Sequence, residues 1–147
     1  EFSKRMNEIS SLEIVEATDQ MDLIPGKGYI CPGGKHMQVL KSSNGYESYL
    51  LEPLPTDLYK PSIDILLNSI AKFKSPKTMG VIMTGMSNDG SQGLLSMRKN
   101  KSLTVIQDEK SSIIYGMPKS AKDNEAAEIE LNLINIIELL RVKEENK

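Results

Sequence analysis

The sequence is poor in the residues that build disulfides and metal sites. Cys31 is its single cysteine and cannot form an internal disulfide, which is typical of a protein that folds in a reducing compartment. One histidine and one cysteine do not supply the usual ligand set of a transition-metal site. We therefore expect neither a metal nor a cofactor, and a fold that depends on its hydrophobic core.

An excess of one charge and a long apolar run are missing as well. The 18 Lys and Arg residues face 20 Asp and Glu residues, a formal net charge of −2, so no basic field attracts nucleic acid. No apolar run approaches the roughly 20 residues of a membrane-spanning helix, and the first residues show no signal-peptide pattern. These shortages predict a cytoplasmic protein with no nucleic-acid partner and no membrane insertion. The length of 147 residues and the hydrophobic content of 39% are typical of a single domain, over residues 1–147, with its own core.

The most informative stretch is residues 81–93, V-I-M-T-G-M-S-N-D-G-S-Q-G. Its first three residues are typical of a short strand covered on both faces, and Gly85 and Gly90 permit a tight turn. Ser91–Lys99 then carries the apolar stripe of a short helix, in which Gly93 leaves no side chain where the helix must pack closely. Asp89 is thereby placed at the carboxyl end of a parallel strand, the edge where open α/β sheets hold their ligands.

Two interpretations of Asp89 follow from this placement. Asp is a preferred N-cap and suits the positive end of a helix dipole, so the local pattern alone favours a cap of the following helix over a catalytic role. Ser87 is a further candidate, because residues 85–87 begin like the nucleophile elbow G-x-S-x-G. Asp89 stands at the fifth position, where that motif needs glycine, so Ser87 is interpreted as a turn residue.

Elsewhere, periodicity and turn signals predict alternating strands and helices. Asn44 and Gly45 lie between two apolar runs and predict a β-hairpin turn, since both residues accept positive φ. Asn132 is a candidate N-cap for a last helix whose Leu133, Ile136, Ile137 and Leu140 are expected to face inward.

Strands are predicted at residues 12–17, 29–31, 37–40, 47–51, 81–83, 103–106 and 129–131. Helices are predicted at residues 1–10, where no cap precedes the helix, from Pro61, over Ser91–Lys99, from Pro118 and from Leu133, with a helical turn over 108–115. This order predicts an α/β protein, a three-layer αβα fold with a mostly parallel sheet plus an antiparallel β-hairpin.

Several motifs then agree with one family. Residues 85–90, G-M-S-N-D-G, followed by G-L-L at 93–95, resemble the signature G-M-x-x-D-G-x-x-G-L-L of the CheB-type chemotaxis protein-glutamate methylesterases. The order and spacing of four more stretches are similar to that family: residues 25–36, with Cys31 where the family usually has Ala, 61–64 (P-S-I-D), 104–109 (T-V-I-Q-D-E) and 111–118 (S-S-I-I-Y-G-M-P). These stretches span nearly the whole chain, apart from residues 122–127, where the family commonly has a Gly and more apolar residues.

The resemblance implies a serine-hydrolase mechanism of which this chain holds one part. The family's domain opens with G-x-S-x-G-G, which carries the nucleophilic Ser, followed by Q-H-M, which carries the catalytic His, and neither motif occurs in residues 1–147. The acid of the triad maps onto Asp89, and Met86 maps onto the residue beside the oxyanion site. His36 belongs to the P-G-G-x-H loop and is expected to shape or hydrogen-bond the rim of the active site. The resemblance thus implies the C-terminal portion of a CheB-type methylesterase domain.

The family also implies a substrate and partners. It hydrolyses methyl esters on receptor glutamates and deamidates particular receptor glutamines, so the implied partner is the cytoplasmic helical bundle of methyl-accepting chemotaxis receptors, with a receiver domain elsewhere in the parent protein. Two alternatives stay open at this point. One is a non-catalytic α/β module that holds an anion with the loop at residues 85–93 and a helix N-terminus. The other is an interaction domain that only docks to receptors.

Overall fold

The computed structural model describes the backbone of residues 1–145 and the side chains of residues 1–142. The elements, in chain order, are α1 (Phe2–Ile9), β1 (Glu13–Glu16), β2 (Met21–Leu23), β3 (Lys27–Ile30), β4 (His36–Ser42), β5 (Gly45–Leu51), α2 (Ile63–Ala71), β6 (Met79–Ile82), α3 (Ser91–Lys99), β7 (Leu103–Gln107), α4 (Met117–Asp123), β8 (Ile129–Leu131) and α5 (Leu133–Glu145). No helix of the described part is both long and apolar enough to span a bilayer.

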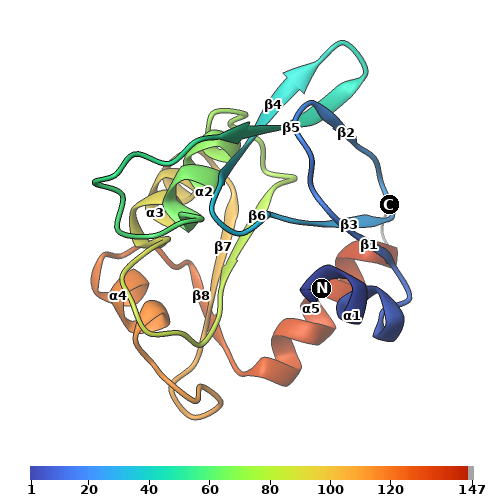
Figure 1. Ribbon diagram of the computed structural model, residues 1–147. Helices are drawn as coiled ribbons and strands as arrows, with labels where there is room; N and C mark the ends of the chain where they lie inside the picture. Colours follow the sequence, from blue (N-terminus) through green and yellow to red (C-terminus); the bar gives the residue numbers. More distant parts are fainter. Residues whose placement is uncertain (146–147) are drawn as a thin grey trace.

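The strands form parallel and antiparallel sheets, which confirms the predicted α/β class. Strands β6, β7 and β8 make a parallel sheet in that order, with Val81 opposite Val105, in agreement with the mostly parallel sheet predicted from the order of strands and helices. Strands β1 and β3 form a separate parallel pair, and β2, β5 and β4 form an antiparallel sheet. Figure 1 shows α3 and α4 on one side of the β6–β8 sheet and α5 on the other.

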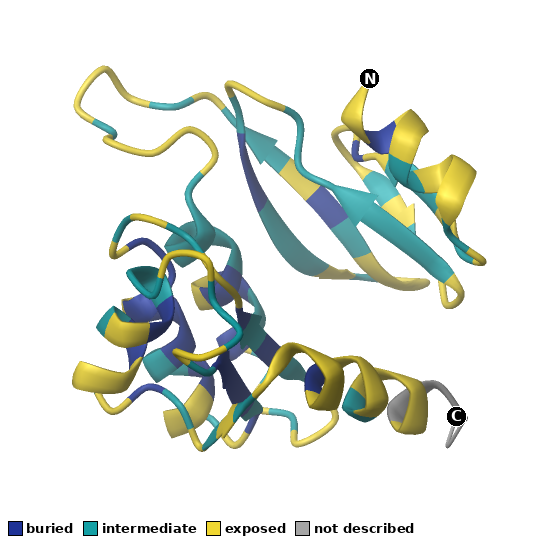
Figure 2. Ribbon diagram, turned by 90° about the horizontal axis from the view of Figure 1, so that it is seen from below, coloured by how far each residue is buried: buried dark blue, intermediate teal, exposed yellow. Residues whose placement is uncertain are grey.

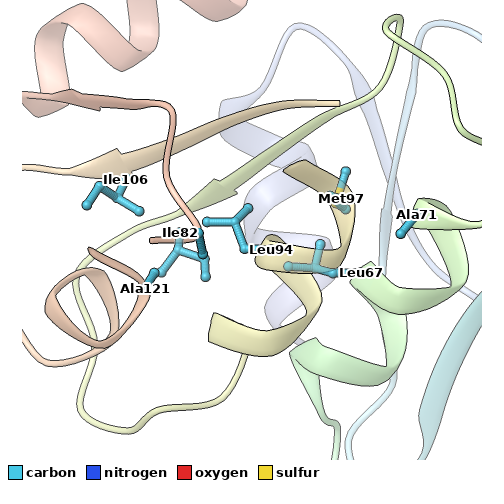
Figure 3. Close-up of a cluster of buried hydrophobic side chains, with 8 residues drawn as sticks. Leu67, Ala71, Ile82, Leu94, Met97, Ile106 and Ala121 are labelled. Atoms are coloured by element: carbon cyan, nitrogen blue, oxygen red, sulfur yellow. The ribbon is translucent and has the colours of Figure 1, made fainter. Parts of the chain in front are cut away.

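The core lies between that parallel sheet and the helices α2, α3 and α4. Leu94 and Met97 of α3 are completely buried against Ile82 of β6 and Ile106 of β7, with Leu67 of α2 beside them (Figure 3). Full burial of one such side chain contributes about 1.5–3 kcal/mol. Helix α3 therefore sits between the sheet and α2, and both neighbours fix the position of the turn that precedes it.

The antiparallel hairpin is confirmed, although its turn differs from the prediction. Ser42 pairs with Gly45, so Ser43 and Asn44 occupy the loop, and the positive φ of 135° belongs to Gly45. Ser48 of β5 is completely buried and donates its hydroxyl hydrogen to the carbonyl of Thr18 at 2.7 Å. This bond also orients the segment before β2, a short strand that the sequence did not predict because its three residues show no distinct pattern.

Three further predictions are corrected. Strand β6 ends at Ile82, and Val81 is only partly buried, so residues 81–83 are not a strand covered on both faces. Residues 108–115 form turns rather than a helical segment.

In α5, Asn132 does cap the helix by accepting the Asn135 N–H at 2.8 Å. Of the four residues expected to face inward, Ile136 is buried at 1% exposure, whereas the other three are exposed. Helix α5 packs on the sheet at β7 and is otherwise covered little, as Figure 2 shows by its largely exposed surface.

Candidate active site

The candidate site lies where the loops after β6 and β7 meet at the carboxyl edge of the parallel sheet. The Gly85 N–H donates to the Ile114 carbonyl at 3.1 Å, and the Thr84 N–H donates to the side-chain oxygen of the buried Gln107 at 2.8 Å. At Gly116 a Cβ atom would lie 2.7 Å from the Gly85 carbonyl oxygen, so only glycine permits this approach of the two loops. The loop after β7 therefore holds the turn that carries Asp89 in place.

Asp89 is buried, with 5% of its surface exposed, and its carboxylate lies at the N-terminus of α2. One carboxylate oxygen accepts the Ser62 hydroxyl at 2.9 Å and the Asp64 N–H at 3.0 Å, and the other accepts the Ile63 N–H at 2.6 Å. The interpretation of Asp89 as the N-cap of the helix that follows it is therefore wrong. The N-cap of α3 is Gly90, which has a left-handed φ of 92° and makes no side-chain cap. Asp89 instead accepts hydrogen bonds from the first N–H groups of α2.

Asp64 makes the reciprocal contact from α2 to α3. Its carboxylate accepts the Gly93 N–H at 2.6 Å, so each helix has its first turn capped by a carboxylate from the other segment. A helix that begins near Pro61 has Asp64 in its first turn, but the sequence gives no sign of this exchange. Burial raises the pKa of the Asp64 carboxyl, and the charge of Asp89 raises that pKa further. The two acids thus stand close enough to repel each other where both are ionised.

We predict that Asp64→Asn raises the thermal midpoint at pH 7. A carboxyl whose pKa is raised in the folded state binds its proton more tightly there, so ionisation costs stability as pH rises from the ordinary value of 3.8 through the folded value. Asn keeps a carbonyl acceptor for the Gly93 N–H and removes the charge. The midpoint should therefore rise at pH 7 and change little at pH 3, with the exposed Asp22→Asn as the control. A lower midpoint at pH 7 would contradict this expectation.

His36 is buried, with 2% exposure, and joins two loops of the site. Its Nδ1 accepts the Ser62 N–H at 3.0 Å, so Nε2 carries the proton and donates to the Asp57 carboxylate at 3.0 Å. That hydrogen bond, with one from the Leu54 N–H, holds the pKa of the Asp57 carboxyl below its usual value. No motif marked Asp57 as a partner of His36, because the two residues are 21 positions apart and meet only in the folded chain.

The neighbouring Ser62, His36 and Asp57 are not arranged as a catalytic triad. A nucleophilic serine must transfer its hydroxyl proton to the imidazole. Here the imidazole accepts the backbone N–H of Ser62, and the Ser62 hydroxyl donates to Asp89. Ser62 is therefore placed to hold Asp89 and not to attack a substrate.

Met86 and Ser87 lie in the same loop as Asp89. Met86 is 81% exposed and so adds little to the core of the described residues, and its backbone amide is the candidate functional part. The Ser87 hydroxyl oxygen accepts the Asp89 N–H at 3.2 Å, as expected for a turn residue. Both residues are thus positioned by the turn.

A polar hollow of about 530 Å³ lies beside the first turns of α3 and α4. The surrounding residues are Asp64, Asn88, Ser91, Gln92, Gly116, Lys119, Ser120, Asp123 and Asn124. The Lys119 ammonium is paired with Asp123 at 2.5 Å, and the Gly93 amide of α3 is already taken by Asp64. Because Asp64 and Asp123 line this hollow beside its one lysine, their negative charges do not favour the anion-binding alternative.

Together the fold and the site define a class: an α/β domain with a buried carboxylate on a rigid turn at the carboxyl edge of parallel strands. This is how hydrolases with a Ser-His-Asp triad can hold their acid. The family model "CheB methylesterase" matches residues 1–140, and the chain belongs to this family.

Two curated relatives and one solved structure support the family assignment. The chain is 43% identical over 135 residues to "Protein-glutamate methylesterase/protein-glutamine glutaminase 2" of Hahella chejuensis, covering 92% of this chain and 37% of the relative. It is 38% identical over 120 residues to the protein-glutamate methylesterase/protein-glutamine glutaminase of Salmonella typhimurium, covering 82% and 34%. The crystal structure of the Thermotoga maritima CheB methylesterase catalytic domain superimposes with a TM-score of 0.88 at 28% identity, covering 94% of this chain and 73% of that one. The chain thus spans little more than a third of these curated relatives.

Proposed function

We propose that residues 1–147 are the C-terminal portion of a catalytic domain that hydrolyses methyl esters on protein glutamates and deamidates glutamines. The observation that carries the proposal is the burial and triple hydrogen bonding of Asp89 at the edge where the family signature places the triad acid. A carboxylate has about four acceptor positions and Asp89 uses three of them, so one can still accept an imidazole N–H. Asp89 would hold that imidazole in one tautomer and stabilise its protonated form.

The complete reaction needs a nucleophile and a base from outside this chain. A serine hydroxyl would attack the glutamyl carbonyl while a histidine takes its proton, and the same histidine would return the proton to the leaving methanol or ammonia. Water would then release the free glutamate by the same steps. The proposed role of Met86 is to contribute its backbone amide beside the oxyanion, and that of His36 is to shape the rim through Ser62 and Asp57.

The proposed partners follow from the family. The substrate is the cytoplasmic helical bundle of methyl-accepting chemotaxis receptors, which would place the protein in the cytoplasm, and a receiver domain would belong to the parent protein. An interaction domain that only docks to receptors is the rival proposal. The two differ in one observable, because a docking domain would bind methylated receptor without releasing methanol.

We predict that the 147-residue chain alone releases no methanol above background from methylated receptor. Without the nucleophilic serine of G-x-S-x-G-G and the catalytic histidine of Q-H-M, only binding and oxyanion effects could operate. A longer form of the protein that carries G-x-S-x-G-G and Q-H-M should release methanol, and the same form with the motif serine changed to alanine should not. Methanol release by the 147 residues at the rate of the longer form would contradict the prediction. Receptor binding by the longer form without methanol release would favour the docking alternative.

A further inference from the structure

We propose that Ser62 is a positioning residue for Asp89, an inference that rests on the proposed function of Asp89 as the triad acid. The Ser62 hydroxyl provides the single side-chain donor to the Asp89 carboxylate among the hydrogen bonds described, at 2.9 Å, while the other two donors are backbone N–H groups of α2. Backbone donors on a helix cannot move independently. The hydroxyl therefore adds a third hydrogen bond to the carboxylate, and the three bonds together fix the plane of the carboxylate.

The direction of the Ser62 hydroxyl is itself determined. Its oxygen accepts the Ile65 N–H at 3.4 Å, as the N-cap of α2, which leaves its only proton to point at Asp89. The Ser62 backbone is held in turn, because its N–H donates to Nδ1 of the buried His36 at 3.0 Å. Ser62 is thus fixed from two sides before it donates to Asp89, with Asp57 anchoring the far side of the imidazole.

This arrangement gives Ser62 a task that capping alone does not require. Removal of the hydroxyl would leave one carboxylate oxygen with a single donor and allow the carboxylate plane to turn. An imidazole bound to that carboxylate would then lose its orientation toward the serine nucleophile, which slows the chemical step. Because Ser62 donates to Asp89 and not to the reacting ester in this arrangement, substrate binding should change little.

The test uses Ser62→Gly and Ser62→Thr in the longer form that carries all three triad residues. Gly is nearly as good an N-cap as Ser, so the helix should persist, and Thr retains the hydroxyl. We expect Ser62→Gly to lower kcat about tenfold with KM within about twofold, the loss typical of one hydrogen bond to a charged group. Ser62→Thr should restore most of kcat. A kcat unchanged in Ser62→Gly, with only a lower thermal midpoint, would overturn the proposal and leave Ser62 a cap.

A second measurement separates this proposal from the proposed function. The ¹³C resonance of the Asp89 carboxyl, assigned by its loss in Asp89→Asn, should shift in Ser62→Gly and return in Ser62→Thr at pH 7. This readout needs no turnover, so it tests the grip on Asp89 even if the wild-type protein releases no methanol, the result that would refute the proposed function. An Asp89 resonance that is the same in Ser62→Gly and wild type would overturn the role of Ser62.

Discussion

In the longer, triad-bearing form of the protein, Asp89→Asn is expected to lower kcat by about 10⁴, the loss seen when the triad aspartate of a serine protease is changed in the same way. The amide cannot accept the imidazole N–H as the carboxylate does, so the base is held in the wrong tautomer. Two of the hydrogen bonds to residue 89 should be kept, since an amide oxygen can still accept from the Ser62 hydroxyl and the Asp64 N–H.

The structure also predicts a stability cost for this substitution. With the amide oxygen on that side, the amide NH₂ would face the Ile63 N–H, which now donates to Asp89 at 2.6 Å, and two donors would oppose each other. An unsatisfied buried N–H costs about 1–3 kcal/mol, so the thermal midpoint should fall while the protein stays folded at 25 °C.

Kinetics and thermal unfolding of the same samples distinguish the two effects. The matched control is Asp19→Asn, because the Asp19 carboxylate likewise accepts a backbone N–H, that of Leu50 at 2.8 Å, but lies in the turn before β2 and not in the site. This control should keep kcat within about twofold, as is usual for an exposed substitution away from the site. If Asp89→Asn loses stability and keeps most of its turnover, Asp89 is a cap of α2 and not a triad acid.

Gly93→Val is expected to lower the free energy of unfolding by about 3 kcal/mol or more, the upper range for overpacking a core. A Cβ atom at Gly93 would lie 2.7 Å from the Leu67 Cβ and 3.1 Å from backbone atoms of Asp64, and a helix backbone cannot yield as a flexible side chain does. Forcing α3 away from α2 would also lengthen the hydrogen bond from the Gly93 N–H to Asp64.

Urea unfolding of the 147-residue chain measures this loss, with Gly33→Val as the control. Gly33 is exposed, has no left-handed backbone angle, and no atom lies within 4 Å of a Cβ built there. The control should therefore change stability by no more than about 0.5 kcal/mol. Tolerance of valine at both positions would show that α2 and α3 are not in the close contact that the structure describes.

The sequence by itself determined the elements whose signals are local. Ser91–Lys99 was predicted as a helix over the residues that the structure confirms, because its apolar spacing and glycine turn need no distant partner. Ile129–Leu131 and the cap at Asn132 were predictable for the same reason. The placement of Asp89 at the edge of the sheet also follows from the order of strand, turn and helix.

The tertiary structure decided which groups meet across that edge. Asp89 takes its donors from residues 25 to 27 positions away, and His36 meets Asp57 and Ser62 across 21 and 26 positions. A hydrogen bond requires two atoms within about 3 Å, and spacing along the sequence contains no such distance between separate elements. The same reason explains α5, whose apolar spacing predicts a helical face while the neighbouring elements decide that Ile136 is the residue they cover. Local pattern therefore placed the acid at the sheet edge, and packing of α2 against α3 decided that its carboxylate accepts hydrogen bonds from Ser62, Ile63 and Asp64 at the start of α2.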